Sequence, residues 1–462
     1  MKTVDMVVIG AGPAGMAAAI RASQCGASVC VLDEQRLAGG QIYRDVASAS
    51  DHRKAVLGDD YSKGQALVNA FEQSGANHIH GAVVWDVTKQ GVVTFSAQGS
   101  ASQISARTVI VATGALERPM PLPGWTLPGV LTAGAAQILM KSSGLLPENA
   151  ILVGSGPLLY LLATQLIAAN APPVALVETS SRSQWPGALR YAVGAWRGRH
   201  LLIKGMSMLA SIRRAHVPRY CGASNIRVLG EQQAQGIAFE SGGTAVELEG
   251  STVLLHQGVI PNTQITRCLD VDHRWDAQQR CFHPVLDGWG QTSCPNVYVA
   301  GDGARIDGAA AAEHAGYLAA TGAVNKLGLI DDRKRDELAQ DNLKALRSER
   351  AARPFLDALY SPPASVLAPT DDTIICRCEA VTAGDVRRYA QLGCTGPNQT
   401  KAFGRSGMGP CQGRGCATTV TEILAAEHGM THEEVGSYRI RAPLKPVTLG
   451  EAASINEMTS DA

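Results

Sequence analysis

The chain has 462 residues, enough for about three domains with sizeable buried cores, because one domain typically takes roughly 150 residues. Its 41 Lys and Arg balance its 41 Asp and Glu, so no basic surface for nucleic acid is expected. Eleven cysteines in a chain of this length exclude a dense secreted disulfide scaffold, whereas 49 glycines are an excess that nucleotide-binding loops would explain.

Residues 1–20 resemble an export signal only superficially. Asp5 interrupts the apolar run, and three glycines stand where an export helix should be continuous. The most apolar later run, residues 158–169, is shorter than the roughly 20 residues of a membrane-spanning helix. We therefore expect a cytoplasmic protein without a transmembrane segment. Any association with the inner membrane would be peripheral.

The first candidate nucleotide loop follows an apolar strand, residues 4–9, and precedes a helix-favouring segment, residues 16–23. In such a loop the first glycine makes the turn, the second admits a pyrophosphate, and the third lets the helix pack on the strand. A second strand, residues 28–32, ends at Asp33, which we expect to hold a ribose hydroxyl, with Glu34 beside it. The loop residues are Gly10, Gly12, Pro13, Ala14 and Gly15.

Three further glycine turns complete the pattern: one at Gly40-Gln41, and two after apolar strands, at Thr113-Gly114 and Gly301-Asp302. Over residues 1–330 the chain resembles the two-dinucleotide-binding flavoproteins, the superfamily of glutathione and thioredoxin reductases. The resemblance implies that FAD binds at the first loop, at the acidic strand end and at these three turns.

A second loop, Gly154-Ser155-Gly156, follows the strand 150–153. The resemblance implies an inserted NAD(P)-type domain here. Leu159 replaces the third glycine, and its bulk should push the helix from the strand. Glu178, at the ribose position, would repel a 2′-phosphate, which favours NAD or ATP over NADP. The alternative is a retained fold whose nucleotide site is empty or repurposed.

Redox cysteines and catalytic groups are not evident in the flavoprotein part. No cysteine follows Gln41 closely, and neither Cys221 nor Cys268 has a C-x-x-C partner, so thiol-disulfide exchange is disfavoured. The eleven histidines show no metal or nucleophile spacing, and the catalytic residues stay unknown. His314, which follows the Gly-Asp turn, is the histidine considered for a place near the flavin.

A charged helix over residues 331–353, with Asp331 facing Arg335, and a proline-containing connector separate a cysteine-rich module from the rest. Four thiolates imply a soft metal or an iron-sulfur cluster; zinc suits the one-residue gap of the first pair poorly, and a metal-free module is the other alternative. The module resembles the bacterioferritin-associated ferredoxin-like 2Fe-2S domain. That resemblance implies four ligands and leaves Cys394 as packing: the ligands are Cys376, Cys378, Cys411 and Cys416.

The predicted fold class is α/β, with two Rossmann-like nucleotide-binding domains of the glutathione-reductase type and a small cysteine-ligated 2Fe-2S domain. The predicted boundaries are 1–119 and 251–330 for the two parts of the FAD domain, 120–250 for the inserted domain, 331–371 for the linker, 372–435 for the cluster domain and 436–462 for the tail.

Nearly the whole chain resembles the larger flavoprotein subunit of heteromeric opine, D-hydroxyproline and cyanide-forming glycine dehydrogenases, and the segments at Glu117-Arg118-Pro119 and Pro123-Gly124-Trp125 add to this. The resemblance implies an electron-transfer subunit whose partners are an FAD-containing amine-oxidising subunit and a small 2Fe-2S subunit. Besides FAD and the cluster, a further cofactor is considered: NAD or ATP at the second nucleotide loop, or FMN at a subunit interface. The alternatives are a self-contained NADH-dependent reductase and a non-enzymatic docking protein.

Overall fold

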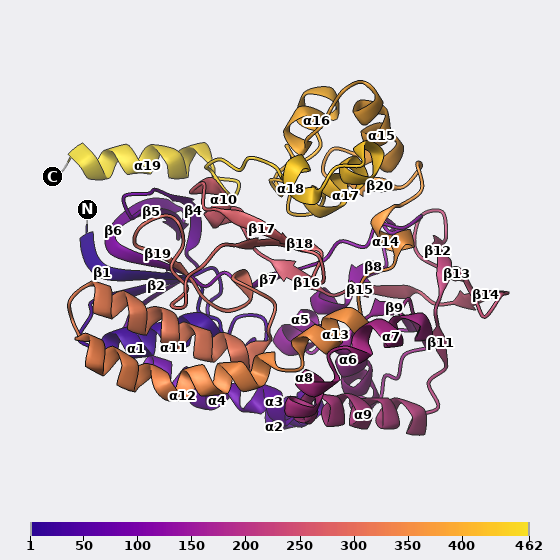
Figure 1. Cartoon of the computed structure of the whole chain (residues 1–462), viewed down its shortest axis with the longest axis horizontal. Helices are drawn as coiled ribbons and strands as arrows, with labels where there is room; N and C mark the ends of the chain where they lie inside the picture. The colour runs from indigo at the N-terminus through magenta and orange to yellow at the C-terminus, as the bar shows by residue number, and fades with distance from the viewer. Residues whose placement is uncertain (1, 461–462) are drawn as a thin grey trace.

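A seven-stranded sheet forms the first part of the molecule, which the computed structural model describes over residues 2–460 (Figure 1). Its strands are β1 (Lys2–Ile9), β2 (Val29–Asp33), β3 (Asn77–His80), β4 (Val83–Val87), β5 (Val92–Ala97), β6 (Ser100–Val111) and β19 (Val297–Val299). They run in the order β3-β2-β1-β6-β5-β4, with β19 also paired to β6. β1 pairs in parallel with both β2 and β6, so its apolar C-terminal half is buried in the centre of the sheet.

Helices cover this sheet, and two of them lie unusually close together. α1 (Pro13–Gln24) follows the first glycine loop, and α11 (Ala309–Lys326) packs along it. The close approach requires glycine, because a methyl group on Gly316 would overlap the Ala14 carbonyl. In Figure 1, α12 (Asp332–Arg350) lies beneath α11, and the shorter helices continue the layer. Those helices are α2 (Asp51–Leu57), α3 (Asp59–Ser62) and α4 (Gly64–Glu72).

The charged helix is present, but its ion pairs differ from the prediction. Asp331 accepts a hydrogen bond from the Lys334 backbone N at 2.8 Å and so caps the N-terminus of α12. Arg335 pairs instead with Asp332, at 2.9 Å, and with Asp336. The expected ion pair between Asp331 and Arg335 is therefore wrong, because the Asp331 carboxylate caps the N-terminus of the helix instead.

A second, five-stranded parallel sheet has the order β11-β10-β9-β15-β8. Its strands are β8 (Val130–Thr132), β9 (Ala150–Ser155), β10 (Ala175–Glu178), β11 (Arg219–Cys221) and β15 (Thr252–Gln257). The antiparallel strands β12 (Ser224–Leu229), β13 (Gly236–Ser241) and β14 (Thr244–Glu249) lie beside it. Its helices are α5 (Ala133–Ser143), α6 (Pro157–Ala168), α7 (Trp185–Leu189), α8 (Ala192–Arg197) and α9 (Arg199–Arg214). The predicted second Rossmann-like unit is thus formed, with Leu159 fully buried in its core.

The two sheets are joined by a short ribbon in which β7 (Ala115–Glu117) pairs with β16 (Val259–Pro261). After the ribbon come α10 (Gln264–Cys268) and a hairpin of β17 (His273–Asp276) and β18 (Cys281–Pro284). The linker helices α13 (Arg353–Leu359) and α14 (Ala364–Leu367) run across the second unit to the cysteine module.

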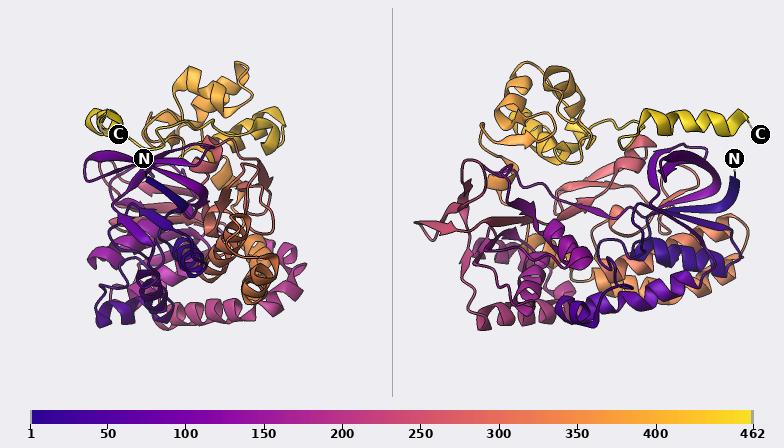
Figure 2. Two further views of the ribbon diagram at one scale, coloured as in Figure 1. Left: turned by 90° about the vertical axis from the view of Figure 1, so that its left-hand side faces the viewer. Right: turned by 180° about the vertical axis from the view of Figure 1, so that it is seen from behind.

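The cysteine module stands on the hairpin side of the molecule, where Figures 1 and 2 show it in orange and yellow. Its interior belongs to one buried apolar cluster with side chains of the first sheet, including Val7 and Val109. The C-terminal helix α19 (Leu449–Ser460) leaves the module and lies along β6. The module contains β20 (Ile374–Cys376), β21 (Val381–Thr382), α15 (Ala383–Gln391), α16 (Pro397–Gly404), α17 (Ala417–His428) and α18 (His432–Val435).

The helices of the described part of the chain can be compared with the requirements of a membrane-spanning helix. Among the helices of residues 2–460, none combines the length and the apolar composition that a membrane span requires. The longest, α12, is strongly charged.

Candidate cofactor sites

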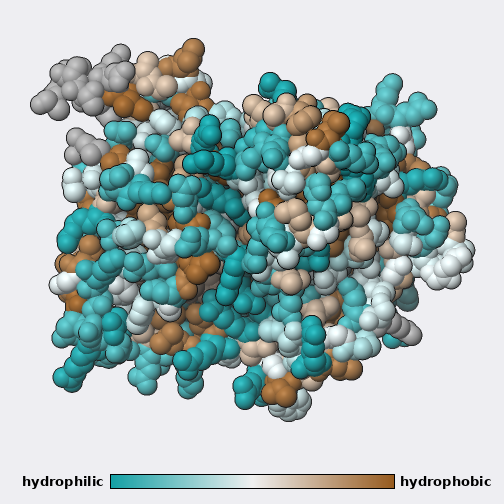
Figure 3. Space-filling view, turned by 45° about the horizontal axis from the view of Figure 1, so that its top comes forward, coloured by the Kyte–Doolittle hydropathy of each residue, from teal (hydrophilic) through white to brown (hydrophobic). Residues whose placement is uncertain are grey.

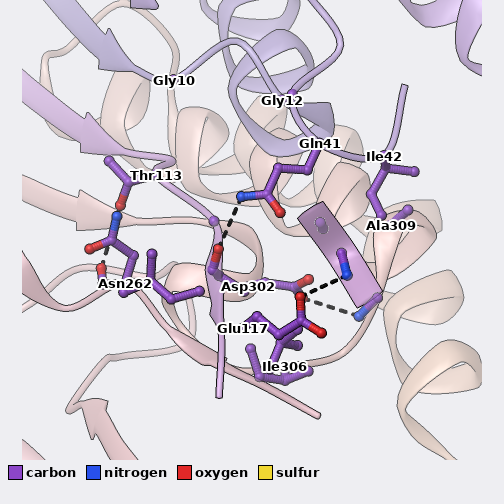
Figure 4. Close-up of a pocket in the computed structure, with 18 of the residues that line it drawn as sticks. Gly10, Gly12, Gln41, Ile42, Thr113, Glu117, Asn262, Asp302, Ile306 and Ala309 are labelled. Carbon is purple, nitrogen blue, oxygen red and sulfur yellow. Dashed lines mark hydrogen bonds between the residues drawn. The ribbon is translucent and has the colours of Figure 1, made fainter. Parts of the chain in front are cut away.

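A cavity of about 580 Å³ lies between the two sheets, and both glycine loops reach it. Figure 4 shows Gly10 and Gly12 of the first loop at this cavity. Of the predicted cofactor residues, four lie outside its wall: Gly15, Gly154, Glu178 and Gly301. The others line it: Gly10, Gly12, Pro13, Ala14, Asp33, Glu34, Gly40, Gln41, Thr113, Gly114, Gly156 and Asp302.

In the first loop, Gly10 and Gly15 have no room for a side chain, whereas Gly12 faces the cavity. Gly10 has φ +104°, and a methyl group there would lie 2.5 Å from the Ala112 carbonyl oxygen. A methyl group on Gly15 would overlap the Gly10 carbonyl. A Cβ on Gly12 would meet only the Cα of Gly40, at 3.7 Å, because this backbone faces the cavity. The loop therefore fits a pyrophosphate approaching at Gly12.

Three helices begin at the cavity wall. α1, α6 and α11 have as N-caps Gly12, Gly156 and Gly308 respectively, and all three glycines line the cavity. Helix N-termini present free N–H groups and partial positive charge. The cavity is therefore suited to a ligand with more than one phosphate.

The two acidic residues after β2 have different surroundings. Asp33 accepts hydrogen bonds from the Ala11 backbone N at 2.5 Å and the Gln35 backbone N at 2.7 Å, and so ties the glycine loop to the strand end. Glu34 pairs with Lys445 from the C-terminal tail. The ribose role of Asp33 stays a prediction, and Glu34 is the carboxylate of the two whose oxygens are less engaged with backbone.

The Gly-Asp turn supports the start of α11. Asp302 accepts hydrogen bonds from the backbone N of Asp307 and of Gly308, each at 3.1 Å, while burial raises the pKa of its carboxyl group. Gly301 is a packing position, because a methyl group there would lie 2.8 Å from the Ala14 Cβ. Gln41, which also lines the cavity, donates to the Ala115 carbonyl at 3.2 Å (Figure 4).

A buried histidine and glutamate on the wall were missed by sequence reasoning. The Glu117 carboxylate lies 2.6 Å from Nδ1 of His256 and accepts a hydrogen bond from the Gly134 backbone N at 2.8 Å. With Nδ1 held, Nε2 of His256 faces the second glycine loop, 3.4 Å from where a Cβ of Gly156 would stand. His314 instead lies near the Asn342 side chain and does not line the cavity.

Arg118 is a second wall residue that received no role from the sequence. Its guanidinium donates to the carbonyls of Gln257 at 3.1 Å, Arg280 at 3.0 Å and Gln279 at 2.5 Å, and burial lowers its pKa. A buried cation bonded to neutral carbonyls keeps its positive charge and adds to the attraction of the cavity for anions.

The second glycine loop departs from the predicted nucleotide geometry. A methyl group on Gly154 would overlap the His256 carbonyl, so this glycine serves strand packing. Glu178 is buried and accepts hydrogen bonds from the Tyr160 hydroxyl at 2.8 Å and from Arg219. A ribose could reach its carboxylate only by replacing these partners, and the ribose role of Glu178 stays a prediction.

The four predicted cluster ligands meet as two hydrogen-bonded pairs. Cys376 pairs with Cys416, and Cys378 with Cys411. The bond from Cys416 lowers the pKa of the Cys376 thiol to about 6, which favours a thiolate. Within residues 2–460, no three Cys, His, Asp or Glu side chains converge as ligands of a single ion. Two cysteine pairs fit a dinuclear cluster, in which each iron takes two thiolates.

The cysteine loops are held by glycines and by a tyrosine of the C-terminal tail. A methyl group on Gly409 would overlap the Cys378 side chain, whereas one on Gly407 or Gly413 would lie 2.6 Å from the Tyr438 ring. The buried Tyr438 hydroxyl lies 3.9 Å from Sγ of Cys416. No motif marks this tyrosine in the sequence.

The cysteine module and the cavity share a wall. Arg414, between the last two cysteines, lines the cavity and donates to the Leu444 carbonyl at 3.2 Å. Gln264, also on the wall, donates to the Gln412 carbonyl at 3.3 Å. Because Gln412 directly follows Cys411, the loop that carries Cys411 contacts the wall of the cavity.

A buried ion pair attaches the module to the hairpin. Arg280 donates to Glu422 of α17 at 2.9 and 2.5 Å, and the Glu422 carboxylate also contacts Nε2 of His432 at 2.7 Å. Burial alone would raise the pKa of Glu422, but the bonds to His432 and Arg280 bring it below its usual value. On the same side, the His432 ring stacks on Trp275 with centroids 4.1 Å apart.

We expect Glu422→Gln to lower the free energy of unfolding by up to about 3 kcal/mol at neutral pH, because it leaves the partly buried Arg280 without its counter-charge. A carboxyl group with a lowered folded-state pKa stabilises the protein above the usual pKa of Glu, and this contribution is lost as pH falls through the folded value. Urea unfolding of both proteins at pH 7 and near pH 4 should show the difference shrinking in acid. Glu427→Gln, on the exposed side of α17, is the control and should cost less than about 1 kcal/mol.

Comparisons with known proteins agree with this architecture. Residues 4–316 match the pyridine nucleotide-disulphide oxidoreductase family, and residues 374–426 match the BFD-like [2Fe-2S] binding domain. These families imply FAD binding and a 2Fe-2S cluster. The predicted fold class is confirmed.

Curated relatives match over nearly the whole chain. The A subunit of opine oxidase from Agrobacterium tumefaciens (strain Ach5) is 44% identical, over 98% of this chain and 92% of the relative. The hydrogen cyanide synthase subunit HcnB of Pseudomonas protegens is 28% identical, over 96% of each chain. Among solved structures, L-proline dehydrogenase from P. horikoshii aligns with a TM-score of 0.70 at 19% identity, over 97% of this chain and 79% of the other, which shows a shared fold.

Proposed function

Because the chain belongs to the pyridine nucleotide-disulphide oxidoreductase family and, over its length, to the family of opine oxidase A subunits, we propose that it is the electron-transfer subunit of a heteromeric amino-acid or opine dehydrogenase. As an FAD-dependent oxidoreductase subunit, it would take electrons from a cytoplasmic partner flavoprotein on which the C–N bond is oxidised. Relatives named as subunits of an oxidase and of a synthase support the existence of partner chains.

The observation that carries this proposal is the wall shared by the cavity and the cysteine module. When bound, FAD exchanges two electrons and a 2Fe-2S cluster exchanges one at a time. Arg414 belongs to the loop between Cys411 and Cys416, yet its side chain lines the cavity. Neighbouring candidate redox sites are what an electron-transfer subunit needs, and this supports the proposal.

In this proposal the cavity residues have separate roles. Gly12 and the N-terminus of α1 bind the pyrophosphate, and Glu34 or Asp33 binds the ribose. Gln41, bonded to the Ala115 carbonyl, and Asp302 shape the remainder of the cavity. The cluster ligands are the four paired cysteines: Cys376, Cys378, Cys411 and Cys416.

Coexpression with the amine-oxidising subunit tests the proposal. The purified complex should contain FAD and iron and should reduce a dye with an amino acid or opine, whereas this chain alone should not. Amine-dependent turnover by the isolated chain would overturn the assignment. Mass analysis of released nucleotides would identify the occupant of the second loop as NAD, ATP or FMN, and analysis of the complex would reveal a small 2Fe-2S subunit.

A self-contained NADH-dependent reductase is the second candidate, and one observation favours it: the second glycine loop opens into the same cavity as the first. Against it, Glu178 is engaged by Tyr160 and Arg219. Anaerobic mixing with NADH separates the two, because a reductase would lose its flavin absorbance within the turnover time. We expect slow or absent bleaching.

Tyr438→Phe should retain the cluster and lower its reduction potential. In the structure the Cys416 thiol donates to the Tyr438 hydroxyl, which donates to Ser406. As a cluster ligand Cys416 would be a thiolate that can only accept, so the hydroxyl would turn to donate to it and would stabilise the more negative, reduced cluster. A hydrogen bond worth about 1 kcal/mol corresponds to roughly 40 mV for one electron. Redox titration followed by EPR measures the change, and iron content checks that the cluster is present. An unchanged potential would remove Tyr438 from this role.

A further inference from the structure

Six large apolar side chains are exposed on the three consecutive helices α7, α8 and α9. Val193 and Trp196, one helical turn apart on α8, are 71% and 72% exposed. Surface apolar residues scattered singly are ordinary, but a group on adjoining elements marks an interaction surface. The six residues, here called the α7–α9 surface, are Trp185, Leu189, Val193, Trp196, Ile203 and Met206.

The same segment has a one-sided charge. No Asp or Glu occurs between Glu178 and Glu231, although the chain as a whole is neutral. The basic residues in this interval are eight arginines and one lysine. Those with exposed side chains on the three helices, or directly after α7 in the case of Arg190, are Arg190, Arg197, Arg199, Lys204, Arg213 and Arg214.

The α7–α9 surface is one helix away from the cavity. α7, α8 and the start of α9 pack around Phe355 of α13. The next residues of α13, Leu356 and Asp357, line the cavity. Tyr191, between α7 and α8, accepts a hydrogen bond from Gln278, which also lines the cavity. A protein bound to this surface would therefore rest against the outer side of a cavity wall.

We propose that the α7–α9 surface is the docking surface for the partner subunit, and that the partner presents an apolar face bordered by carboxylates. This inference rests on the proposed function, because it identifies where the amine-oxidising subunit binds. Trp, Tyr, Met and Arg are the residues enriched at protein interfaces, whereas Lys is depleted there. The segment follows that pattern, and its unbalanced arginines call for acidic partners.

A second copy of this chain fits less well, and a membrane surface is an alternative that the test below addresses. A twofold dimer would bring the same arginines against one another, since a twofold interface pairs one patch with itself. Along the edge of the surface, Lys204 already pairs with Asp60, and His200 with Glu349, so the positive charge that remains for a partner is carried by the arginines. By contrast, the face over the cysteine module is mostly hydrophilic, with apolar residues scattered across it (Figure 3).

The test compares two surface variants with a matched control. Val193→Ser/Trp196→Ser removes the apolar centre, and Arg197→Glu/Arg199→Glu reverses the charge. Leu145→Ser/Leu392→Ser removes apolar residues of similar exposure, 59% and 62%, elsewhere on the molecule. Each full-length protein is titrated with the purified amine-oxidising subunit. We expect each surface variant to raise the Kd at least about tenfold, and the control to leave it unchanged, with equal flavin and iron contents in all.

The outcomes separate this inference from the proposed function. If the unmodified chain forms no complex with the amine-oxidising subunit, the proposed function fails. If that complex forms and both surface variants bind as tightly as the unmodified chain, the docking surface is wrong while the function stands. Cosedimentation of the isolated chain with vesicles of anionic phospholipid, or its concentration-dependent dimerisation, would also overturn the inference if either were lost in the surface variants.

Discussion

Gly12→Val is expected to abolish FAD binding while leaving the fold intact. The backbone of Gly12 has φ −76° and ψ −177°, which any L-residue can adopt. A Cβ there meets only the Gly40 Cα, at 3.7 Å, so the branched side chain would extend into the cavity at the N-terminus of α1. It would block the N–H groups that an anion needs. The loss of two charge-assisted hydrogen bonds, at about 1.5–3 kcal/mol each, weakens binding by roughly a hundredfold or more.

Flavin absorbance per chain after purification measures the effect, and circular dichroism checks the fold. Gly15→Ala is the contrasting variant. Its methyl group would overlap the Gly10 carbonyl, so it should lower the melting temperature before it affects binding selectively. Normal FAD content in Gly12→Val would refute the assignment of the first loop.

Much of this site could be predicted because it is built from local motifs. The strand, turn and helix of the first loop are adjacent in sequence, and the glycines that the motif requires are those whose Cβ has no space or would face the cavity. The cysteines were equally visible, since two short pairs become neighbours once the small module folds. The second Rossmann-like unit formed although Leu159 replaces a glycine, because its core accommodates the leucine fully buried.

The residues that were missed are brought together over long separations. Glu117 and His256 are 139 positions apart and touch only because β7 and β16 pair at the junction of the two sheets. A single histidine has no spacing that marks it, so the one in the wall could not be distinguished from His314. Spacing also cannot tell which oxygen atoms are already in use: Asp33 lies at the expected distance from Gly10, yet its carboxylate accepts two backbone bonds.

Cys378→Ser is expected to remove the cluster without unfolding the chain. Cys378 is the exposed member of the four cysteines, so a hydroxyl in place of its thiol costs little in packing. Serine oxygen is a much poorer ligand than thiolate for iron in such a cluster. Iron should fall from about two per chain to near zero, with loss of the EPR signal of the reduced cluster. FAD content should be unchanged, because Cys378 does not line the cavity.

Cys394→Ser provides the control that makes the result specific. This cysteine lies in the same module and is buried, but it belongs to neither pair, so its variant should keep about two irons per chain. Retained iron in Cys378→Ser, or lost iron in Cys394→Ser, would contradict the ligand assignment.

A further cysteine variant separates electron transfer from docking. If Cys411→Ser lost the cluster and assembly with the partner while the partner kept its turnover, the module would be a docking element. If assembly stayed intact and dye reduction by the complex fell, the cluster would be part of the electron path.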